Sequence, residues 1–270
     1  LFLISIISRI IVVLIYGDTH FDNEWDHLLN NLINNKTLSL ADPSDEFLLP
    51  NLLMPPLYAY YLYIFSFLEL EIKNFLLVVL FSQVILSTIS VIVFYKINNF
   101  FFKEKISFYS SLLFSIIPIY LYSCSQISSV TLTLFLALFF YYLFFKIKFK
   151  RKIKHIILFS IIGGMLILLR REFIGIVVLS NFYLLLFCKI RIKYFLTIFL
   201  ITLITISPYL IRNYIIFDKI IISTGLGYNL WKANNPKSIT EGFEVYNENK
   251  DLMSKIQKIP KNELYRINQN

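Results

Sequence analysis

The chain has 270 residues, of which 57% are hydrophobic and only 16% are charged, and its mean hydropathy is +0.67. Soluble domains carry about 25% charged residues, and a water-soluble fold of this composition would expose large apolar patches. The net charge of +9 does not indicate a nucleic-acid partner, because the basic residues lie in short loops between apolar runs. Composition therefore predicts an all-α, polytopic transmembrane helix bundle surrounded by membrane lipids.

Apolar runs that approach the roughly 20 helical residues needed to cross a bilayer recur along the chain. Strands are excluded because an open sheet leaves its backbone polar groups unsatisfied in lipid. Gly163 and Gly164 favour close helix packing, and Pro208 should kink or end the last run. We predict about seven spans: 1–16, 74–97, 107–123, 130–147, 155–169, 173–188 and 194–217.

The loops that join these runs alternate in charge. The segments 17–73 and 123–129 are acidic or uncharged, so the positive-inside rule puts them outside and the amino end in the cytoplasm. We predict a transmembrane module over 1–217, followed outside by the start of a polar segment over 218–270 that is truncated. The basic, cytoplasmic loops are 96–106, 146–155 and 189–193.

The first external segment is too long for a simple connector and predicts two helices that lie along the outer surface. Apolar residues recur at i, i+3, i+4 and i+7 from Trp25 to Leu32, which indicates an amphipathic helix, with Asp22 placed to cap it. After Pro55-Pro56, the Tyr-rich run 58–68 is too short to cross a bilayer and should lie in the interface.

Four carboxylates gather between Asp18 and Asp26, at the outer boundary of the first span. A carboxylate there can act as a general base toward a hydroxyl or amine, or can hold a cation. We take Asp22, Asp18 and Glu24 as candidate catalytic residues. The alternative is structural: Asp22 caps the helix and its neighbours complement the helix dipole. Both roles can hold for one residue.

Arginine at the outer ends of spans runs against the positive-inside rule. Because a guanidinium can bind phosphate oxygens with bidentate geometry, Arg170, Arg171 and Arg212 are candidate phosphate ligands, and snorkelling to headgroups is the alternative. Arg9, inside the first span, indicates a structural ion pair or an incomplete first helix. The sequence shows no motif with metal-ligand spacing, so we predict no metal site and no cofactor.

In their order and topology, four motifs resemble the GT-C class of integral-membrane glycosyltransferases. The resemblance is to the bacterial relatives of protein O-mannosyltransferases and aminoarabinose transferases (glycosyltransferase family 39-like). Arg171 departs from the family by replacing a proline, and Met54 stands where relatives often have Lys or His. The second external loop offers Ser128-Ser129 in place of an acidic residue. The motifs are Asp22-Asn-Glu-Trp25, the Pro-Pro-Leu-Tyr segment 55–58, Leu169-Arg-Arg-Glu-Phe173, and Pro208-Tyr-Leu-Ile-Arg-Asn-Tyr214 with the segments 223–231 and 233–236.

The resemblance implies a polyprenyl-phosphate donor carrying one sugar, whose phosphate is held by Arg170, Arg171 and Arg212. It also implies a lipid, glycan or protein acceptor activated by Asp22, with transfer by inversion at the periplasmic face of a bacterial inner membrane. The main alternative is a polytopic lipid or solute transporter or flippase without transferase chemistry. An O-antigen polymerase or ligase and a structural subunit are further readings. Charges inside the spans are nearly absent, which favours surface chemistry over translocation.

Overall fold

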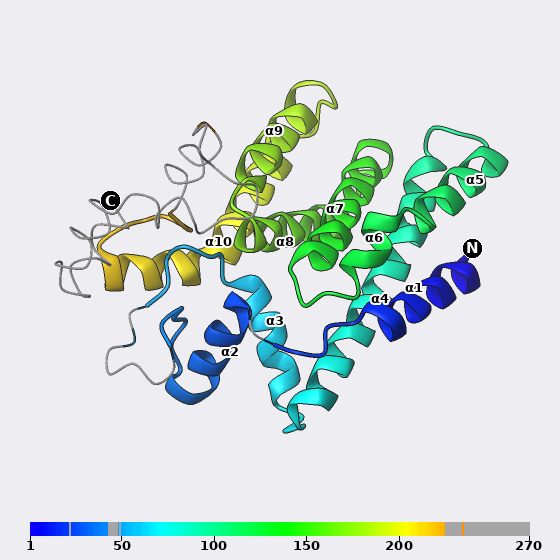
Figure 1. Ribbon diagram of the computed structural model, residues 1–270. Coiled ribbons are helices and arrows are strands. Elements are labelled where there is room, and N and C mark those ends of the chain that lie inside the picture. The colour runs from blue at the N-terminus through cyan, green and yellow to red at the C-terminus, as the bar shows by residue number, and fades with distance from the viewer. Residues whose placement is uncertain (22, 43–47, 49, 225–233, 235–270) are drawn as a thin grey trace.

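A computed structural model describes residues 1–21, 23–42, 48, 50–224 and 234. In these ranges the regular elements are ten α-helices, and the only strand-like pairing is an isolated bridge between Ser39 and Pro50. The predicted all-α membrane helix bundle is confirmed (Figure 1). The helices are α1 (Phe2–Tyr16), α2 (Glu24–Asn35), α3 (Leu57–Ser66), α4 (Ile72–Asn98), α5 (Glu104–Ser115), α6 (Pro118–Ser123), α7 (Val130–Lys150), α8 (Ile153–Leu169), α9 (Phe173–Leu186) and α10 (Ile192–Phe217).

Among the described residues, three helices, α4, α7 and α10, are long and apolar enough to cross a membrane. Three further apolar helices, α1, α8 and α9, have between 10 and 17 residues and fall short of that length. The membrane character of the chain therefore rests on α4, α7 and α10, and the full count of seven spans stays a prediction.

The predicted span over 107–123 is not one helix but two, α5 and α6. Pro118 begins α6, and Ile117 before it has an extended backbone with φ −63° and ψ 121°. A proline has no N–H to continue a helix, and it disfavours the helical region for the residue before it. The expectation of a continuous helix was wrong because it overlooked this proline.

Pro208 has a milder effect, because α10 continues through it from Ile192 to Phe217. The proline removes the N–H that would bond the carbonyl of Ile204. The hydroxyl of Ser207 donates to that carbonyl at 2.9 Å instead. The helix changes direction along its length (Figure 1) but does not end at Pro208.

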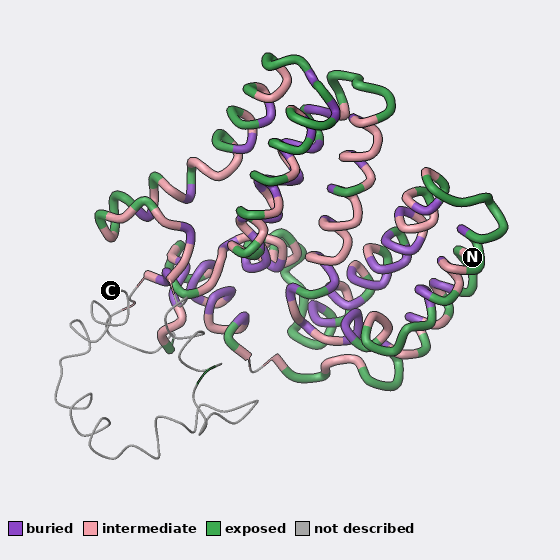
Figure 2. The backbone as a smooth tube through the Cα atoms, turned by 90° about the horizontal axis from the view of Figure 1, so that it is seen from above, coloured by how far each residue is buried: buried purple, intermediate pink, exposed green. Residues whose placement is uncertain are grey.

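The core of the bundle is a row of packed helices in which α4 contacts α7, α7 contacts α8, and α8 contacts α10. The close packing predicted for the two glycines is confirmed. A Cβ on Gly164 would stand 2.6 Å from the Cβ of Thr205 in α10, and one on Gly163 would stand 3.3 Å from Phe140 in α7. Phe140 in turn stacks on Phe159 with ring centroids 4.2 Å apart. Buried residues face these contacts, and exposed residues line the outer faces of the helices (Figure 2).

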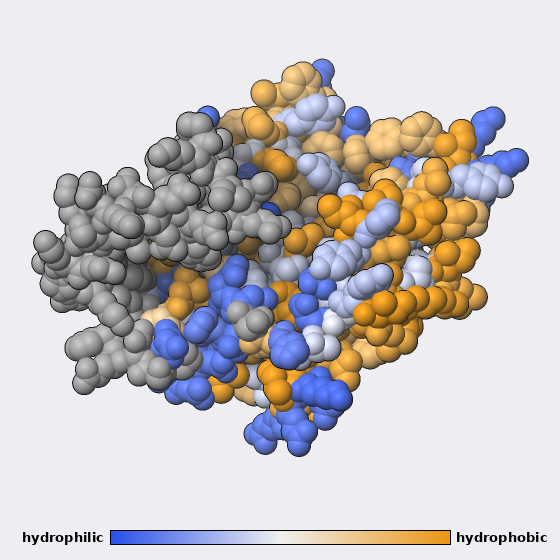
Figure 3. All heavy atoms as spheres, in the orientation of Figure 1, coloured by the Kyte–Doolittle hydropathy of each residue, from blue (hydrophilic) through white to orange (hydrophobic). Residues whose placement is uncertain are grey.

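The two ends of the bundle differ in character. The connections α4–α5, α7–α8 and α9–α10, which carry the basic loops, lie on the side opposite α2 and α3 (Figure 1). Apolar residues cover the visible face over α1 and its neighbours, whereas hydrophilic residues gather around α2 and the α3–α4 turn (Figure 3). The two helices predicted for the first external segment are confirmed. They pack through Trp25 of α2 and Tyr58 of α3, whose rings meet edge to face at 4.7 Å.

Candidate functional site

Asp18 follows α1 directly and is fastened to the loop 123–129. Its backbone N–H donates to the carbonyl of Ser125 at 3.0 Å, and its Oδ2 accepts the N–H of Ile127 at 2.6 Å. A carboxylate that accepts a backbone N–H forms one of the stronger hydrogen bonds in proteins. Asp18 therefore joins two segments that lie 109 positions apart in the chain.

Side-chain amides complete the contact between this loop and its surroundings. The Nε2 atom of Gln126 donates to the carbonyl of Tyr16 at 3.0 Å, and the Nδ2 atom of Asn23 donates to the carbonyl of Ile127 at 3.2 Å. These residues were not singled out from the sequence, because a side chain that bonds a distant backbone leaves no periodic signal. The first external segment and the loop 123–129 thus form one hydrogen-bonded unit.

The start of α2 corrects one expectation about the acidic cluster. Asn23 occupies the N-cap, and its Oδ1 accepts the N–H of Trp25 at 3.0 Å. Because the helix begins at Glu24, the capping role predicted for Asp22 belongs to Asn23. Asp22 itself lies outside the described residues. Glu24 is exposed in the first turn, where its charge complements the helix dipole.

A junction of two backbone segments, 51–52 and 223–224, holds one of the predicted arginines. The segments meet where the N–H of Thr224 donates to the carbonyl of Leu52 at 2.8 Å. Arg171, just after α8, donates from Nη1 to the carbonyls of Ser223, at 3.1 Å, and of Thr224. Its only described ionic partner is the exposed carboxylate of Glu172, 3.9 Å from Nε. A pair this long, with an exposed carboxylate, compensates little charge.

Arg212 reaches the same junction from α10. Its Nη1 donates to the carbonyl of Asn51 at 2.9 Å and to Oδ1 of Asn213 at 2.7 Å. The guanidinium carbon lies 5.5 Å from the ring centroid of Tyr209 and 5.3 Å from that of Phe217, within cation–π range. In the described part of the chain, hydrogen bonds engage only Nη1 of Arg171 and of Arg212. The structure thus brings these two arginines to one junction.

Arg170, the third predicted arginine, is exposed and does not join them. It is the C-cap of α8, with an extended backbone at φ −148° and ψ 114°. Its neighbour Arg171 therefore carries the contact with the junction. The remaining parts of the fourth motif, 225–231, Ala233, Asn235 and Pro236, lie outside the described residues.

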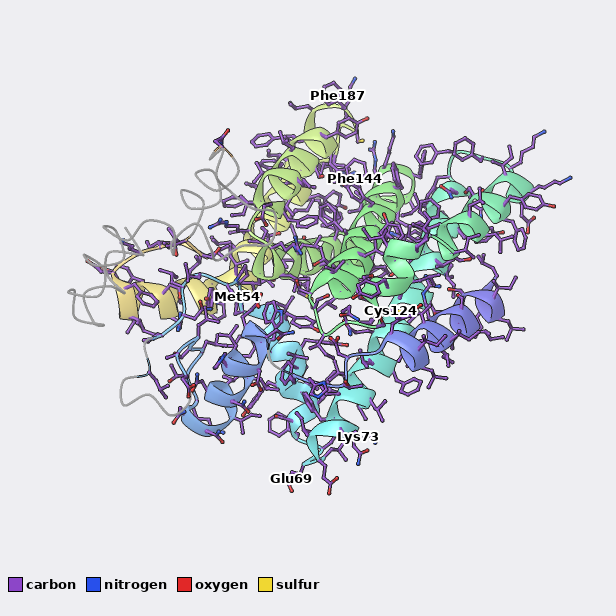
Figure 4. All side chains as sticks on the ribbon, in the orientation of Figure 1. Met54, Glu69, Lys73, Cys124, Phe144 and Phe187 are labelled. Atoms are coloured by element: carbon purple, nitrogen blue, oxygen red, sulfur yellow. The ribbon has the colours of Figure 1, made fainter. Side chains whose placement is uncertain are left out.

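Asn51 shapes the turn that leads into α3. Its Oδ1 accepts the N–H groups of Leu53 and Met54 at 2.8 and 3.1 Å, and its Nδ2 donates to the carbonyl of Met54 at 2.9 Å. Figure 4 shows Met54 where the chain enters α3. Sequence reasoning missed Asn51, although an asparagine ahead of Pro-Pro is typical of such a side-chain-stabilised turn. Because Arg212 donates to Asn51, its guanidinium lies beside the turn that carries Met54.

The first turn of α3 carries two tyrosines whose pKa values are raised. Tyr58 is fully buried, and within the described ranges its hydroxyl has no hydrogen-bond partner. Burial, then the nearby Tyr61 and the charge of Asp18, raise the pKa of Tyr58 well above its usual value. Burial also raises the pKa of Tyr60, against the opposing influence of Arg212. Asp18 is thus near enough to affect Tyr58, and Arg212 near enough to affect Tyr60, in the first turn of α3.

The sequence matches the model of the dolichyl-phosphate-mannose-protein mannosyltransferase family over residues 54–211, more than half of the chain. The chain belongs to this family, and it is accordingly an integral membrane glycosyltransferase of the GT-C type. The resemblance read from the motifs is confirmed. Comparisons with curated proteins and with solved structures give no significant match. The matched region contains α3 and Arg171, whereas Asp18, Asp22 and Arg212 lie outside it.

Proposed function

We propose that this protein transfers one sugar from a polyprenyl-phosphate donor to a lipid, glycan or protein acceptor. The reaction takes place at the outer face of the membrane, which is the periplasmic face of a bacterial inner membrane. The main support is the arrangement around the first turn of α3, in a chain of this family. Arg171 and Arg212 meet at the junction with the segment 51–52, which leads into α3, and Asp18 is near enough to Tyr58 in the first turn of α3 to affect its pKa.

The donor side of the proposal rests on the charge of Arg171 and Arg212. Both donate from Nη1 to neutral carbonyl groups, which leaves their positive charge for an anion. A phosphodiester next to them would accept charge-assisted hydrogen bonds from the rest of each guanidinium. The exposed Arg170 is next to Arg171 in sequence, and we expect it to contact the donor phosphate once the donor is bound. The polyprenyl chain itself would lie against the apolar surface of the bundle.

The departure at Met54 fits this assignment. Relatives that the motifs resemble often carry Lys or His at this position, which gives them a positive charge at the start of α3. Here Arg212 hydrogen-bonds Asn51, and Asn51 holds the backbone of Met54. Arg212 thus supplies positive charge beside the same turn.

On the acceptor side, Asp22 is the proposed catalytic base. It takes the proton of the acceptor hydroxyl or amine as that atom attacks the anomeric carbon of the sugar. The bond from the anomeric carbon to the phosphate oxygen breaks, polyprenyl phosphate leaves with the bonding electrons, and the configuration inverts. Asp18 is engaged with the N–H of Ile127 and anchors the loop, while Glu24 is an exposed residue of α2.

The test is an assay of membranes that contain the protein, using polyprenyl phosphates that carry labelled hexoses or pentoses. We expect label to appear in a lipid, glycan or protein fraction, and to be lost in the Asp22→Asn variant at equal protein abundance. Membranes without the protein control for endogenous transferases. If the intact protein moves no label into any fraction but moves the donor across proteoliposome membranes, the proposal is wrong and the protein is a transporter.

A further inference from the structure

Arg9 lies in the middle of the apolar helix α1, and only 1% of its surface is exposed. Burial of an arginine in an apolar bundle is costly unless its N–H groups find partners. Within the described ranges it makes no ion pair, which was one of the two explanations that the sequence offered for it. Its partners are serine oxygens: Nε donates to Oγ of Ser87 in α4 at 2.7 Å, and Nη1 donates to Oγ of Ser5 at 2.7 Å.

A further bond of Arg9 reaches the break between α5 and α6. Its Nη1 donates to the carbonyl of Ser115, the last residue of α5, at 3.2 Å. The last carbonyls of a helix have no intrahelical donor. Two other carbonyls in this turn have local donors. The Ser115 hydroxyl donates to the carbonyl of Leu112 at 2.7 Å, and the N–H of Ile116 donates to the carbonyl of Leu113 at 3.2 Å. Arg9 therefore supplies the donor for a carbonyl that the break at Pro118 leaves open.

The other end of α6 is fastened to the same two helices. Beyond α6, Gln126 donates from its side chain to the carbonyl of Tyr16 at the end of α1, and its own carbonyl accepts Nε2 of Gln83 at 2.9 Å. Gln83 and Ser87 are four residues apart and so lie on one face of α4. Figure 4 labels Cys124, the first residue after α6. The short helix α6 is thus held at both ends by α1 and α4.

We propose that Arg9 is a positioning residue for the transferase reaction. By fixing the end of α5, just before the chain turns into α6, it sets the position of the loop 123–129, which holds Asp18 and with it the start of the acidic first loop. The inference rests on the proposed function, because it assigns a consequence for catalysis to this contact. Arginine suits the role because its planar fork bonds Ser87 and Ser115 at the same time, whereas a lysine ammonium is a compact point charge.

The experiment uses the full chain, with the variants Arg9→Gln, Arg9→Lys and Ser87→Ala. Ser90→Ala is the matched control, because Ser90 is also buried in α4 but its hydroxyl bonds, among the described residues, only the carbonyl of Leu86 in its own helix, at 2.8 Å. Two quantities are measured on folded protein. They are the amide hydrogen exchange of the peptide 123–130, and kcat and KM for a labelled polyprenyl-phosphate sugar.

We expect Arg9→Gln to raise exchange in the peptide 123–130 by about tenfold. The same variant should lower kcat by about ten- to a hundredfold and leave the donor KM within about twofold, since misplacement of a reacting group by about 1 Å has effects of this size. Arg9→Lys should recover part of both effects, and Ser87→Ala should move both in the same direction by less. Ser90→Ala should match the wild type.

The proposal is overturned if a folded Arg9 variant keeps wild-type exchange and kcat, or if KM changes in place of kcat. If Arg9→Gln does not fold, the pair of serine variants decides, and equal behaviour of Ser87→Ala and Ser90→Ala overturns it. If wild-type protein transfers no sugar, the proposed function fails on its own account. In that case the exchange data still report whether Arg9 fixes the loop.

Discussion

The acidic loop and the arginine junction are built in opposite ways. Asp18 accepts a backbone N–H from Ile127 at 2.6 Å. Arg171 and Arg212 donate to backbone carbonyls, which are neutral. A carboxylate bonded in this manner is occupied as an acceptor, whereas a guanidinium that uses one nitrogen atom keeps its other donors and its charge. The acidic loop is therefore anchored through Asp18, while the arginine junction retains capacity for an anionic ligand.

This difference predicts which groups should bind the donor and which should take part in the chemical step. Removing an arginine of the junction should weaken the hold on the donor phosphate and appear mainly in KM. Removing the base should appear in kcat, because proton transfer belongs to the transition state. Substitution of the anchor Asp18 should lower kcat by less than substitution of the base, since its hydrogen bond can be made by a neutral amide as well as by a carboxylate.

The largest effect is expected for Asp22→Asn. Loss of a general base typically costs a factor of about 10² to 10⁴ in rate, and the donor KM should stay near the wild-type value. Glu24→Gln is the matched control, because Glu24 is an exposed neighbour in the same acidic cluster and its loss should leave kcat within about twofold. Steady-state kinetics on both variants measures this, and a wild-type kcat in Asp22→Asn would remove Asp22 from the mechanism.

The next largest effect is expected for Arg212→Gln. A hydrogen bond to a charged group is worth about 1.5–3 kcal/mol, so the donor KM should rise by about ten- to a hundredfold with a smaller change in kcat. Adding Met54→Lys to this variant should lower KM again, because it returns a positive charge to the turn that Asn51 holds. A double variant no better than Arg212→Gln alone would show that Arg212 acts by holding the junction together.

Variants at Asp18 distinguish a structural anchor from a proton acceptor. Asp18→Asn keeps an oxygen that can accept the N–H of Ile127, so kcat should fall by no more than about threefold, whereas Asp18→Ala should cost about tenfold through loss of the bond. A catalytic carboxylate would behave otherwise, because asparagine and alanine would both abolish proton transfer. Kinetics on the two variants, at matched abundance in the membrane, distinguishes the roles. Comparable, severe losses in both would make Asp18 the base.

Much of the fold could be predicted because it depends on local pattern. The apolar runs gave the bundle, and the spacing from Trp25 to Leu32 gave α2. The two prolines were harder. Pro118 ends a helix that was expected to continue, and Pro208 lies inside one that was expected to kink or end there, where Ser207 bonds the orphaned carbonyl. Whether a helix ends at a proline or continues through it depends on which donors can bond the carbonyl that the proline leaves open. The periodicity of the sequence does not indicate this.

For the candidate site, the sequence predicted which residues take part but not which partners they bond. Residue chemistry and topology singled out Arg171, Arg212 and Asp18. Their contacts depend on bonds between a side chain and a distant backbone, such as Arg212 on Asn51 across 161 positions. No periodicity encodes such a bond. Asp22 lies outside the described residues, so its role remains a prediction from the motif.

The smallest effect concerns Tyr58, whose ring packs against Trp25 of α2. Its pKa is raised in the folded protein, so the folded state resists its ionisation. The stability this contributes is fully present below the unfolded pKa of about 10 and is lost as pH rises toward the folded value. Tyr58→Phe should therefore blunt the fall in melting temperature above about pH 10, and at neutral pH should change stability by less than about 1 kcal/mol, because the buried hydroxyl lacks a partner. Thermal unfolding across alkaline pH measures this, with the exposed Tyr109→Phe of α5 as control. If both variants kept the wild-type alkaline profile, the Tyr58 hydroxyl would lie in a more solvated setting than the contact with Trp25 implies.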